Sequence, residues 1–150
     1  MPARLDEALV LTRIYPVAPE KVWRAWTDPE ALKMWWNQAG YPGWKAELDV
    51  RVGGRYRILM HGPDGRDHDV RGVYREVIPH RRLAFTWTVH RSSPELPRLE
   101  GESLITVVLR PITGVGTELA FRQEPIFDPS ARGGWTGALD NLARHLLAPI

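Results

Sequence analysis

The sequence predicts an α+β domain in which a curved antiparallel sheet of six to seven strands wraps around one long C-terminal helix. Residues 45–123 largely alternate between apolar and polar side chains, which is typical of strands with one buried face. Short turns separate these segments, so neighbouring strands are expected to pair antiparallel. One long amphipathic segment follows, and a sheet with one apolar face requires such a cover. We therefore expect residues 1–150 to form a single domain.

The N-terminal part predicts one strand followed by two short helices. Residues 7–15 (EALVLTRIY) form an apolar run that stops before a proline. Pro19 with Glu20 marks one helix start, and Asp28 with Pro29 marks a second. A proline inside one continuous helix would cost about 3 kcal/mol, which favours two tandem helices. Their apolar faces carry Val22, Trp23, Trp26, Leu32, Trp35 and Trp36.

Turn-forming residues divide the central part of the chain into six further segments. Glycine, proline and aspartate cluster between them, as is typical of tight turns. Gly53 and Gly54 permit the bend or bulge that a strongly curved sheet requires. The segment 91–101 contains two prolines and predicts the longest polar loop of the sheet. The expected strands are residues 45–51, 54–61, 67–77, 82–90, 102–110 and 116–123.

A last helix is predicted to start at Asp128–Pro129 and to stop before Pro149. Apolar residues recur along it at spacings of four, three and four, which places a stripe on one face: Trp135, Leu139, Leu142 and Leu146. Three glycines weaken its first half, since each costs up to about 1 kcal/mol relative to alanine. They allow either a close approach to the sheet or local opening, and they are Gly133, Gly134 and Gly137.

The composition argues against several classes of protein. The chain has no cysteine, which rules out disulfides and thiolate metal sites and fits a reducing compartment. It shows neither a signal-peptide pattern nor the ~18–20 consecutive apolar residues of a transmembrane helix, so we expect a cytoplasmic protein without membrane insertion. The 20 basic and 18 acidic residues are interspersed. An ion-pair lattice on the outer sheet face is therefore favoured over a nucleic-acid site, at Asp49, Arg51, Arg55, Arg57, Arg71 and Arg75.

A sheet covered by one helical rod leaves space at one end unless large side chains fill it. An odd loop in the hairpin of residues 54–77 turns Val70 and His68 to the face of Ile58, whereas an even loop would bury Asp69 at a high cost. Further inward-facing residues are Leu48, Val50, Gly72, Tyr74, Leu83, Val89 and Leu119. The residues expected to line a ligand pocket are Tyr56, Ile58, Met60, His68, Phe85, Trp87, Phe121, Trp135 and Leu139.

Four motifs resemble those of one known family. Residues 19–36 (PEKVWRAWTDPEALKMWW) resemble the signature P-x-x-V-W-x-A-W-T-D-P-x-x-L-x-x-W-W of the activator of heat-shock protein 90 ATPase homologue-like family. Residues 48–56 (LDVRVGGRY) resemble its D-x-R-x-G-G-x-Y/W element, and residues 79–87 (PHRRLAFTW) its P-x-x-R-L-x-F-T-W strand. Residues 134–142 (GWTGALDNL) resemble its G-W-x-x-x-L-D-x-L helix. The four motifs occur in order over nearly the whole chain.

The resemblance implies the START-like, or SRPBCC, helix-grip superfamily, which also holds polyketide cyclases, plant pathogenesis-related proteins and lipid-transfer domains. This is the fold that the pattern of elements predicts. The resemblance leaves the function open, because the fold hosts carriers, cyclases and co-chaperone domains. No catalytic motif of the cyclases is recognisable, and no cofactor is expected.

Two kinds of side chain allow alternative interpretations. The tryptophans either pack as ordinary core or stack on a ligand, and Trp36 with Trp44 could form a pocket lid. His68 is either a general base or a hydrogen-bonded strand histidine. A metal site would need His61, His68 and His90 on one face, and strand parity places His61 opposite His68.

Three functions follow from these patterns, in order of preference. The first is binding of a small hydrophobic ligand in an internal cavity. The second is a protein-interaction domain, with a chaperone partner or a second copy as a homodimer, anchored by exposed Trp36 and Trp44. The least favoured is a cyclase- or hydrolase-type enzyme with His68 as base. No catalytic residue set and no metal site is predicted.

Overall fold

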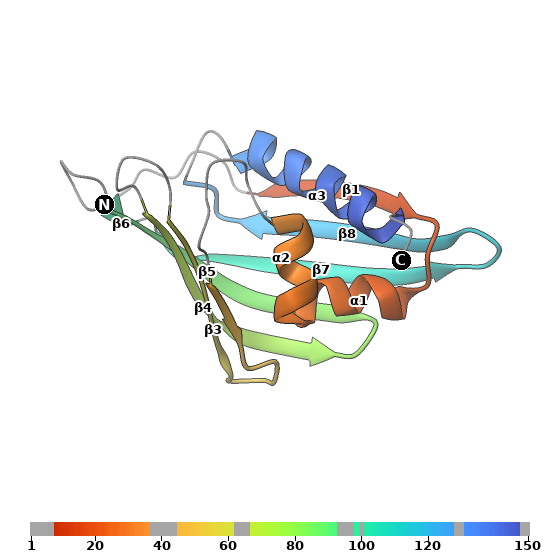
Figure 1. Cartoon of the computed structure of the whole chain (residues 1–150), viewed down its shortest axis with the longest axis horizontal. Helices are drawn as coiled ribbons and strands as arrows, with labels where there is room; N and C mark the ends of the chain where they lie inside the picture. Colours follow the sequence, from red (N-terminus) through yellow and green to blue (C-terminus); the bar gives the residue numbers. More distant parts are fainter. Residues whose placement is uncertain are drawn as a thin grey trace.

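An antiparallel sheet curves around the helices in the computed structural model, which describes residues 8–36, 45–61, 67–92, 98–99, 101–127 and 131–147 (Figure 1). The helices lie together on the concave face of the sheet, as Figure 1 shows. In chain order the described elements are β1 (Leu9–Tyr15), α1 (Pro19–Thr27), α2 (Pro29–Trp36), β2 (Lys45–Leu48), β3 (Arg55–His61), β4 (Asp67–Ile78), β5 (Arg82–Ser92), β6 (Arg98–Leu99), β7 (Ser103–Ile112), β8 (Gly116–Glu124) and α3 (Ala131–Leu147).

Seven strands follow the spatial order β1-β8-β7-β5-β4-β3-β2, and each neighbouring pair is antiparallel. The strands β1 and β2 are consecutive in the sequence but lie at opposite edges. The helices α1 and α2 therefore carry the chain across the concave face. This confirms the predicted α+β fold, with two differences in the strands. The strand expected at residues 45–51 ends at Leu48. The short strand β6, which pairs with β5, lies within the segment 91–101 that was expected to be a loop throughout.

Helix α3 covers the concave face with the stripe that its sequence predicts. Its inward side chains are 0–7% exposed, and they are Trp135, Leu139, Leu142 and Leu146. Buried side chains of the central strands face them, among them Leu83, Phe85, Val107, Leu119 and Phe121. Burying one such side chain contributes about 1.5–3 kcal/mol, so this layer is a major contributor to the stability of the fold. In the described part of the chain, no helix is long and apolar enough to cross a membrane.

Side-chain hydrogen bonds to backbone carbonyls attach helix α3 to the N-terminal elements. The Tyr15 hydroxyl of β1 donates to the Leu139 carbonyl at 3.0 Å, in the middle of α3. The Lys21 ammonium of α1 donates to the Leu146 carbonyl at 2.9 Å, in the last turn. A cation at a helix C-terminus satisfies a carbonyl that has no partner within the helix and also complements the helix dipole. Both bonds fix the position of α3 along the sheet.

The β3–β4 hairpin confirms the odd-loop register. Ile58 lies opposite Val70, and Met60 lies opposite His68. His68 is therefore on the concave side of the sheet, and Asp69 is on the outer side. A bulge between Tyr74 and Glu76 shifts the pairing of β4 with β5, which increases the local twist.

The glycines of α3 do not serve a close approach to the sheet. Outside the neighbouring backbone of α3, a Cβ atom at Gly133, Gly134 or Gly137 would meet no heavy atom of the described residues within 4 Å. All three residues are exposed. Gly72 of β4 behaves in the opposite way, because a Cβ there would lie 1.9 Å from the Thr86 carbonyl oxygen. Only glycine fits at that position.

We expect the triple change Gly133→Ala, Gly134→Ala and Gly137→Ala to stabilise the protein. Each alanine should add about 0.5–1 kcal/mol to the free energy of unfolding, because it reduces the entropy of the unfolded chain without a clash. Urea unfolding measures the effect. Gly72→Ala is the control and should destabilise the protein. Equal effects of both changes would contradict this account of the glycines.

Candidate functional site

Aromatic side chains fill the end of the concave face beside the first turns of α3. Trp36 ends α2, Trp87 lies on β5 and Trp135 lies on α3. Their ring centroids are separated by 5.7 Å (Trp36–Trp87), 5.3 Å (Trp36–Trp135) and 5.2 Å (Trp87–Trp135). Phe121 of β8 packs on Trp135 at 4.5 Å. Trp87 is only half-buried, so this tryptophan cluster (Trp36, Trp87 and Trp135) reaches the surface.

Two further tryptophans pack against the cluster from the core. Trp26 of α1 stacks on Trp135 at 6.3 Å and meets Trp35 edge-on at 4.8 Å. The Trp35 indole donates to the Ala25 carbonyl at 2.9 Å, and the Trp135 indole donates to the Gln123 amide oxygen at 3.0 Å. The Trp26 indole nitrogen is buried without a hydrogen-bond partner among the described residues. Trp35 and Trp135 are therefore held in one orientation by hydrogen bonds, and Trp26 by packing alone.

A small void lies beside the cluster, between the sheet and α2. Its volume is about 20 Å³, and its lining consists of Leu32, Trp36, Leu48, Tyr56, Ile58, Tyr74 and Phe85. That volume is close to the space of one water molecule. We call it the inner void. Its lining is almost entirely apolar.

Tyr56 closes the void on the side of the sheet. Its ring takes the space that a side chain at Gly72 would need, since a Cβ there would lie 2.5 Å from the ring. Its hydroxyl donates to the Thr86 carbonyl of β5. The Thr86 hydroxyl in turn accepts the Val73 amide proton at 2.9 Å. Hydrogen bonds that involve side chains thus join both β3 and β4 to β5 at this step.

The structure brings together some of the nine predicted pocket residues. Tyr56, Ile58 and Phe85 line the inner void. Trp87, Trp135 and Phe121 form the aromatic packing beside it. The remaining three belong neither to the lining of the void nor to this aromatic packing. They are Met60 and Leu139, which are buried core residues, and His68, which is half-buried opposite Met60.

Other expected functional positions are placed as follows. Trp36 is 8% exposed and belongs to the cluster, whereas Trp44 lies outside the described residues. His90 lies opposite Asp69 and therefore on the outer face, away from His68. Within the described ranges, no group of three or more histidine, cysteine, aspartate or glutamate residues could hold a metal ion. The side chain of His61 also lies outside the described set.

Four lining residues of the void were absent from the predicted set. Leu32 and Trp36 are one helical turn apart on α2 and face the void together. Their spacing shows that they share a face, but the sequence does not show which strands that face meets. Leu48 and Tyr74 were expected to point inward by strand parity. Their place next to Phe85 depends on the curvature of the sheet.

The outer face of the same strands carries a second concavity, which we call the outer groove. Its volume is about 570 Å³. Strands β3, β4 and β5 form most of its floor. It is lined by Glu47, Arg55, Tyr56, Arg57, Arg71, Gly72, Val73, Thr86, Thr88, His90 and Glu102. Tyr56 lines both concavities, so the outer groove and the inner void meet at this residue of β3.

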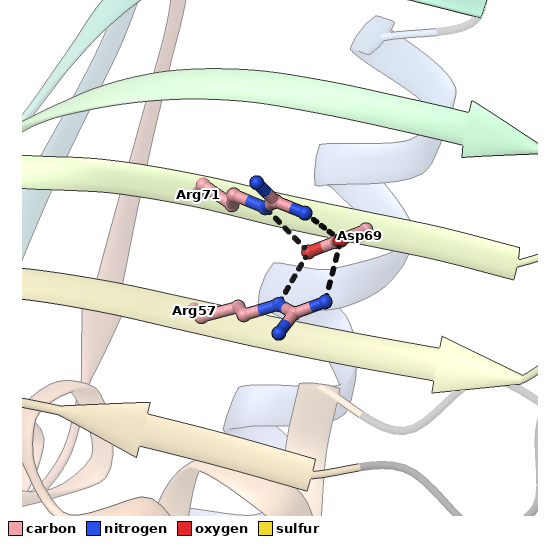
Figure 2. A network of polar contacts seen from close by, with 3 residues as sticks. All are labelled: Arg57, Asp69 and Arg71. Atoms are coloured by element: carbon pink, nitrogen blue, oxygen red, sulfur yellow. Dashed lines mark hydrogen bonds and ion pairs between the residues drawn. The ribbon is translucent and has the colours of Figure 1, made fainter. Parts of the chain in front are cut away.

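Asp69 joins two arginines beside the outer groove (Figure 2). Arg57 donates to its carboxylate through Nε at 3.0 Å and Nη2 at 2.9 Å. Arg71 does the same through Nε at 3.2 Å and Nη2 at 2.7 Å. Burial opposes ionisation of Asp69, but the hydrogen bonds and charges of Arg71 and Arg57 outweigh it and lower the pKa of Asp69 to about 2. The network is thus charged at neutral pH.

The side chains around the inner void determine which contacts it can make. Burial raises the pKa of Tyr56 and of Tyr74, so both phenols stay protonated and serve as hydrogen-bond donors. None of the lining residues is a carboxylate, histidine or lysine. The void therefore offers mainly apolar contacts, because the Tyr56 hydroxyl already donates to the Thr86 carbonyl.

Comparison with known proteins places the chain among related sequences and structures. The family model described as "Activator of Hsp90 ATPase homolog 1-like protein" matches residues 16–147. An uncharacterized protein from Rhizobium leguminosarum has 27% identity and a TM-score of 0.83, with 97% of each chain covered. A protein from Chromobacterium violaceum has 28% identity and a TM-score of 0.76, with 95% of this chain and 99% of that chain covered. The AHSA1 protein from Silicibacter pomeroyi has 26% identity and a TM-score of 0.67, with 93% and 96% covered. No curated protein matches the sequence.

We expect the Asp69 network to make stability depend on acid pH. Because the pKa of Asp69 falls from 3.8 to about 2 on folding, its contribution is present above pH 3.8 and is lost as the pH falls toward about 2. That contribution is about 2 kcal/mol. Asp69→Asn should remove this pH-dependent part, as measured by urea unfolding at several pH values. Glu118→Gln, which breaks the more exposed pair with Arg110, is the control and should change stability by at most about 1 kcal/mol. Identical pH profiles of Asp69→Asn and wild type would contradict the assignment.

Proposed function

The chain belongs to the Activator of Hsp90 ATPase homolog 1-like family, and from its fold and its inner void we propose that it binds a small apolar molecule between the sheet and helix α2. The observation that carries the proposal is the position of the void. It lies between the concave face of the sheet and α2, beside an aromatic cluster that reaches the surface. Its lining is almost entirely apolar. Ligand sites are typically apolar clefts with few polar groups.

Binding requires the void to enlarge, because about 20 Å³ holds little more than one water molecule. Trp36 is the side chain whose movement would create the space. It ends a helix of eight residues, which is too short to be stable on its own and is held by packing. A ligand the size of an indole ring would recover the contacts that Trp36 gives up. We therefore propose that the ligand replaces Trp36 in the cluster.

The proposed ligand contacts fall into two groups. Tyr56, Ile58 and Phe85 already line the void and would contact the ligand first. Trp87 and Trp135 would contact it once Trp36 has moved. The other predicted residues would support these contacts from the surrounding core, and they are Met60, His68, Phe121 and Leu139. We place the protein in the cytoplasm, because a chain without cysteine fits a reducing compartment.

The alternative functions have less support. A protein-interaction domain with a chaperone partner or a second copy would use Trp36 as an exposed anchor, but Trp36 is only 8% exposed. A cyclase- or hydrolase-type enzyme would need His68 near the ligand. His68 does not line the inner void. Binding without chemistry is thus the function that the geometry supports best.

We expect the wild-type protein to bind indole and naphthalene at the inner void. Binding should raise the thermal midpoint and shift the amide NMR signals of Tyr56, Ile58 and Phe85, because the ligand stabilises only the folded state. The absence of both effects at the solubility limit of the two probes would overturn the proposal. Shifts confined to residues outside the void would also overturn it.

We expect Leu48→Trp to abolish this binding. Leu48 is half-buried and lines the void from the edge strand β2, so a larger ring there fills the space without burying a strained side chain. Ala46→Leu is the matched control, because Ala46 is half-buried two residues away on the same strand but does not line the void. The same probes and NMR signals measure both variants. Undiminished binding by Leu48→Trp would contradict the location of the site.

A further inference from the structure

The outer groove has the size of a ligand site, and the proposed function does not use it. Its volume of about 570 Å³ lies within the range of about 300–1,000 Å³ that small-molecule sites occupy. Unlike the inner void, it is lined by charged and hydroxyl side chains. One class of ligand fits three features of this lining: its arginines, its threonines and the glutamates at its two ends.

The arginines provide guanidinium N–H donors that are fixed in position, and some of these donors have no acceptor in Asp69. Arg57 and Arg71 each donate through Nε and Nη2 to Asp69. The third nitrogen of each guanidinium points away from Asp69 in Figure 2. Arg55, two residues from Arg57 and therefore on the same face, has no ion-pair partner among the described residues. Held guanidinium groups lose little entropy when they bind an anion such as a carboxylate.

Thr86 adds a buried donor to the floor of the groove. It is 6% exposed, and its hydroxyl oxygen accepts the Val73 amide proton at 2.9 Å. The proton of the same hydroxyl has no acceptor among the residues that the structure describes. Because Thr86 lines the groove, its hydroxyl proton is available to a ligand oxygen. Thr88 lines the groove two residues further along β5.

Two carboxylates limit the charge that the groove accepts. Glu47 lies opposite Arg57 at the β2 edge, and Glu102 lies at the β7 end. Strands are about 4.8 Å apart, which separates Glu102 from Arg71 by about 10 Å, two strands away. An anion bound between Arg55 and Arg71 is favoured, whereas a second negative group near Glu102 is repelled. A positive group at that end is attracted.

From these features we propose that the outer groove binds a small zwitterionic carboxylate, with its carboxylate at Arg55, Arg71 and Thr86 and its ammonium group at Glu102. The ligand class is that of amino acids whose amino group is distant from the carboxylate. This site lies on the opposite side of the sheet from the inner void. Its test is therefore independent of apolar ligand binding.

The test compares three four-carbon probes on the full chain by amide NMR titration: 4-aminobutyrate, butyrate and succinate. We expect 4-aminobutyrate to shift the signals of Val73, Thr86 and Thr88 with the lowest Kd, about fivefold below that of succinate. Among the three probes, only 4-aminobutyrate carries an ammonium group that can pair with Glu102. Butyrate should fall between them. No shift of these signals at millimolar concentrations, or tightest binding by succinate, would overturn the proposal.

Variants locate the two ends of the ligand. Arg55→Gln should weaken 4-aminobutyrate binding about tenfold, because it removes a charge-assisted hydrogen bond. Glu102→Gln should remove the preference for 4-aminobutyrate over butyrate. Arg75→Gln is the matched control, since Arg75 is exposed on β4 but does not line the groove. All three positions are exposed, and the thermal midpoint without ligand checks that each variant folds. Equal affinities of Arg55→Gln and Arg75→Gln for 4-aminobutyrate would overturn the proposal.

Discussion

The concave face of the sheet is apolar and must be kept from water by helices that cover it from one side only. The stripe of α3 covers β1 and its neighbours, while α1 and α2 carry the chain to the far edge. Between α2, β5 and α3, tryptophan side chains fill the space under the sheet. The hydrogen bonds of Tyr15 and Lys21 to α3 keep the stripe in register with the strands. The inner void is what remains after this filling.

The two concavities have contrasting chemistry because strand alternation separates them. Ile58 and Met60 of β3 face the helices and are apolar, whereas Arg55 and Arg57 of the same strand face the outer groove. Tyr56 is the exception, since it contacts both sides through the space at Gly72. Its hydrogen bond to Thr86 links the shape of the inner void to the floor of the outer groove. A movement of Tyr56 would therefore change the shape of both the inner void and the outer groove.

The fold could be predicted from the sequence because local rules decide most of its elements. Asp28 with Pro29 divides the first helices, and the spacing of Leu139 and Leu142 identifies the buried side of α3. Periodicity also showed which side chains point inward. It could not show that Trp36 would occupy most of the expected pocket, because that depends on the distance between α2 and the sheet. The outer groove could not be predicted either, since alternation identifies the outer residues but not the twist that makes their surface concave.

The mutual contacts of the tryptophan cluster have a consequence for how this protein changes through evolution. Trp36, Trp87 and Trp135 share one space, so a smaller residue at one position leaves a gap that a larger residue at another can fill. Selection then acts on the three side chains jointly, because a change at one alters the packing of the other two. The family motifs that this sequence resembles have tryptophan at all three positions, so a relative that loses one is expected to change another as well. Substitutions at these positions should accordingly accumulate as compensating sets rather than one at a time.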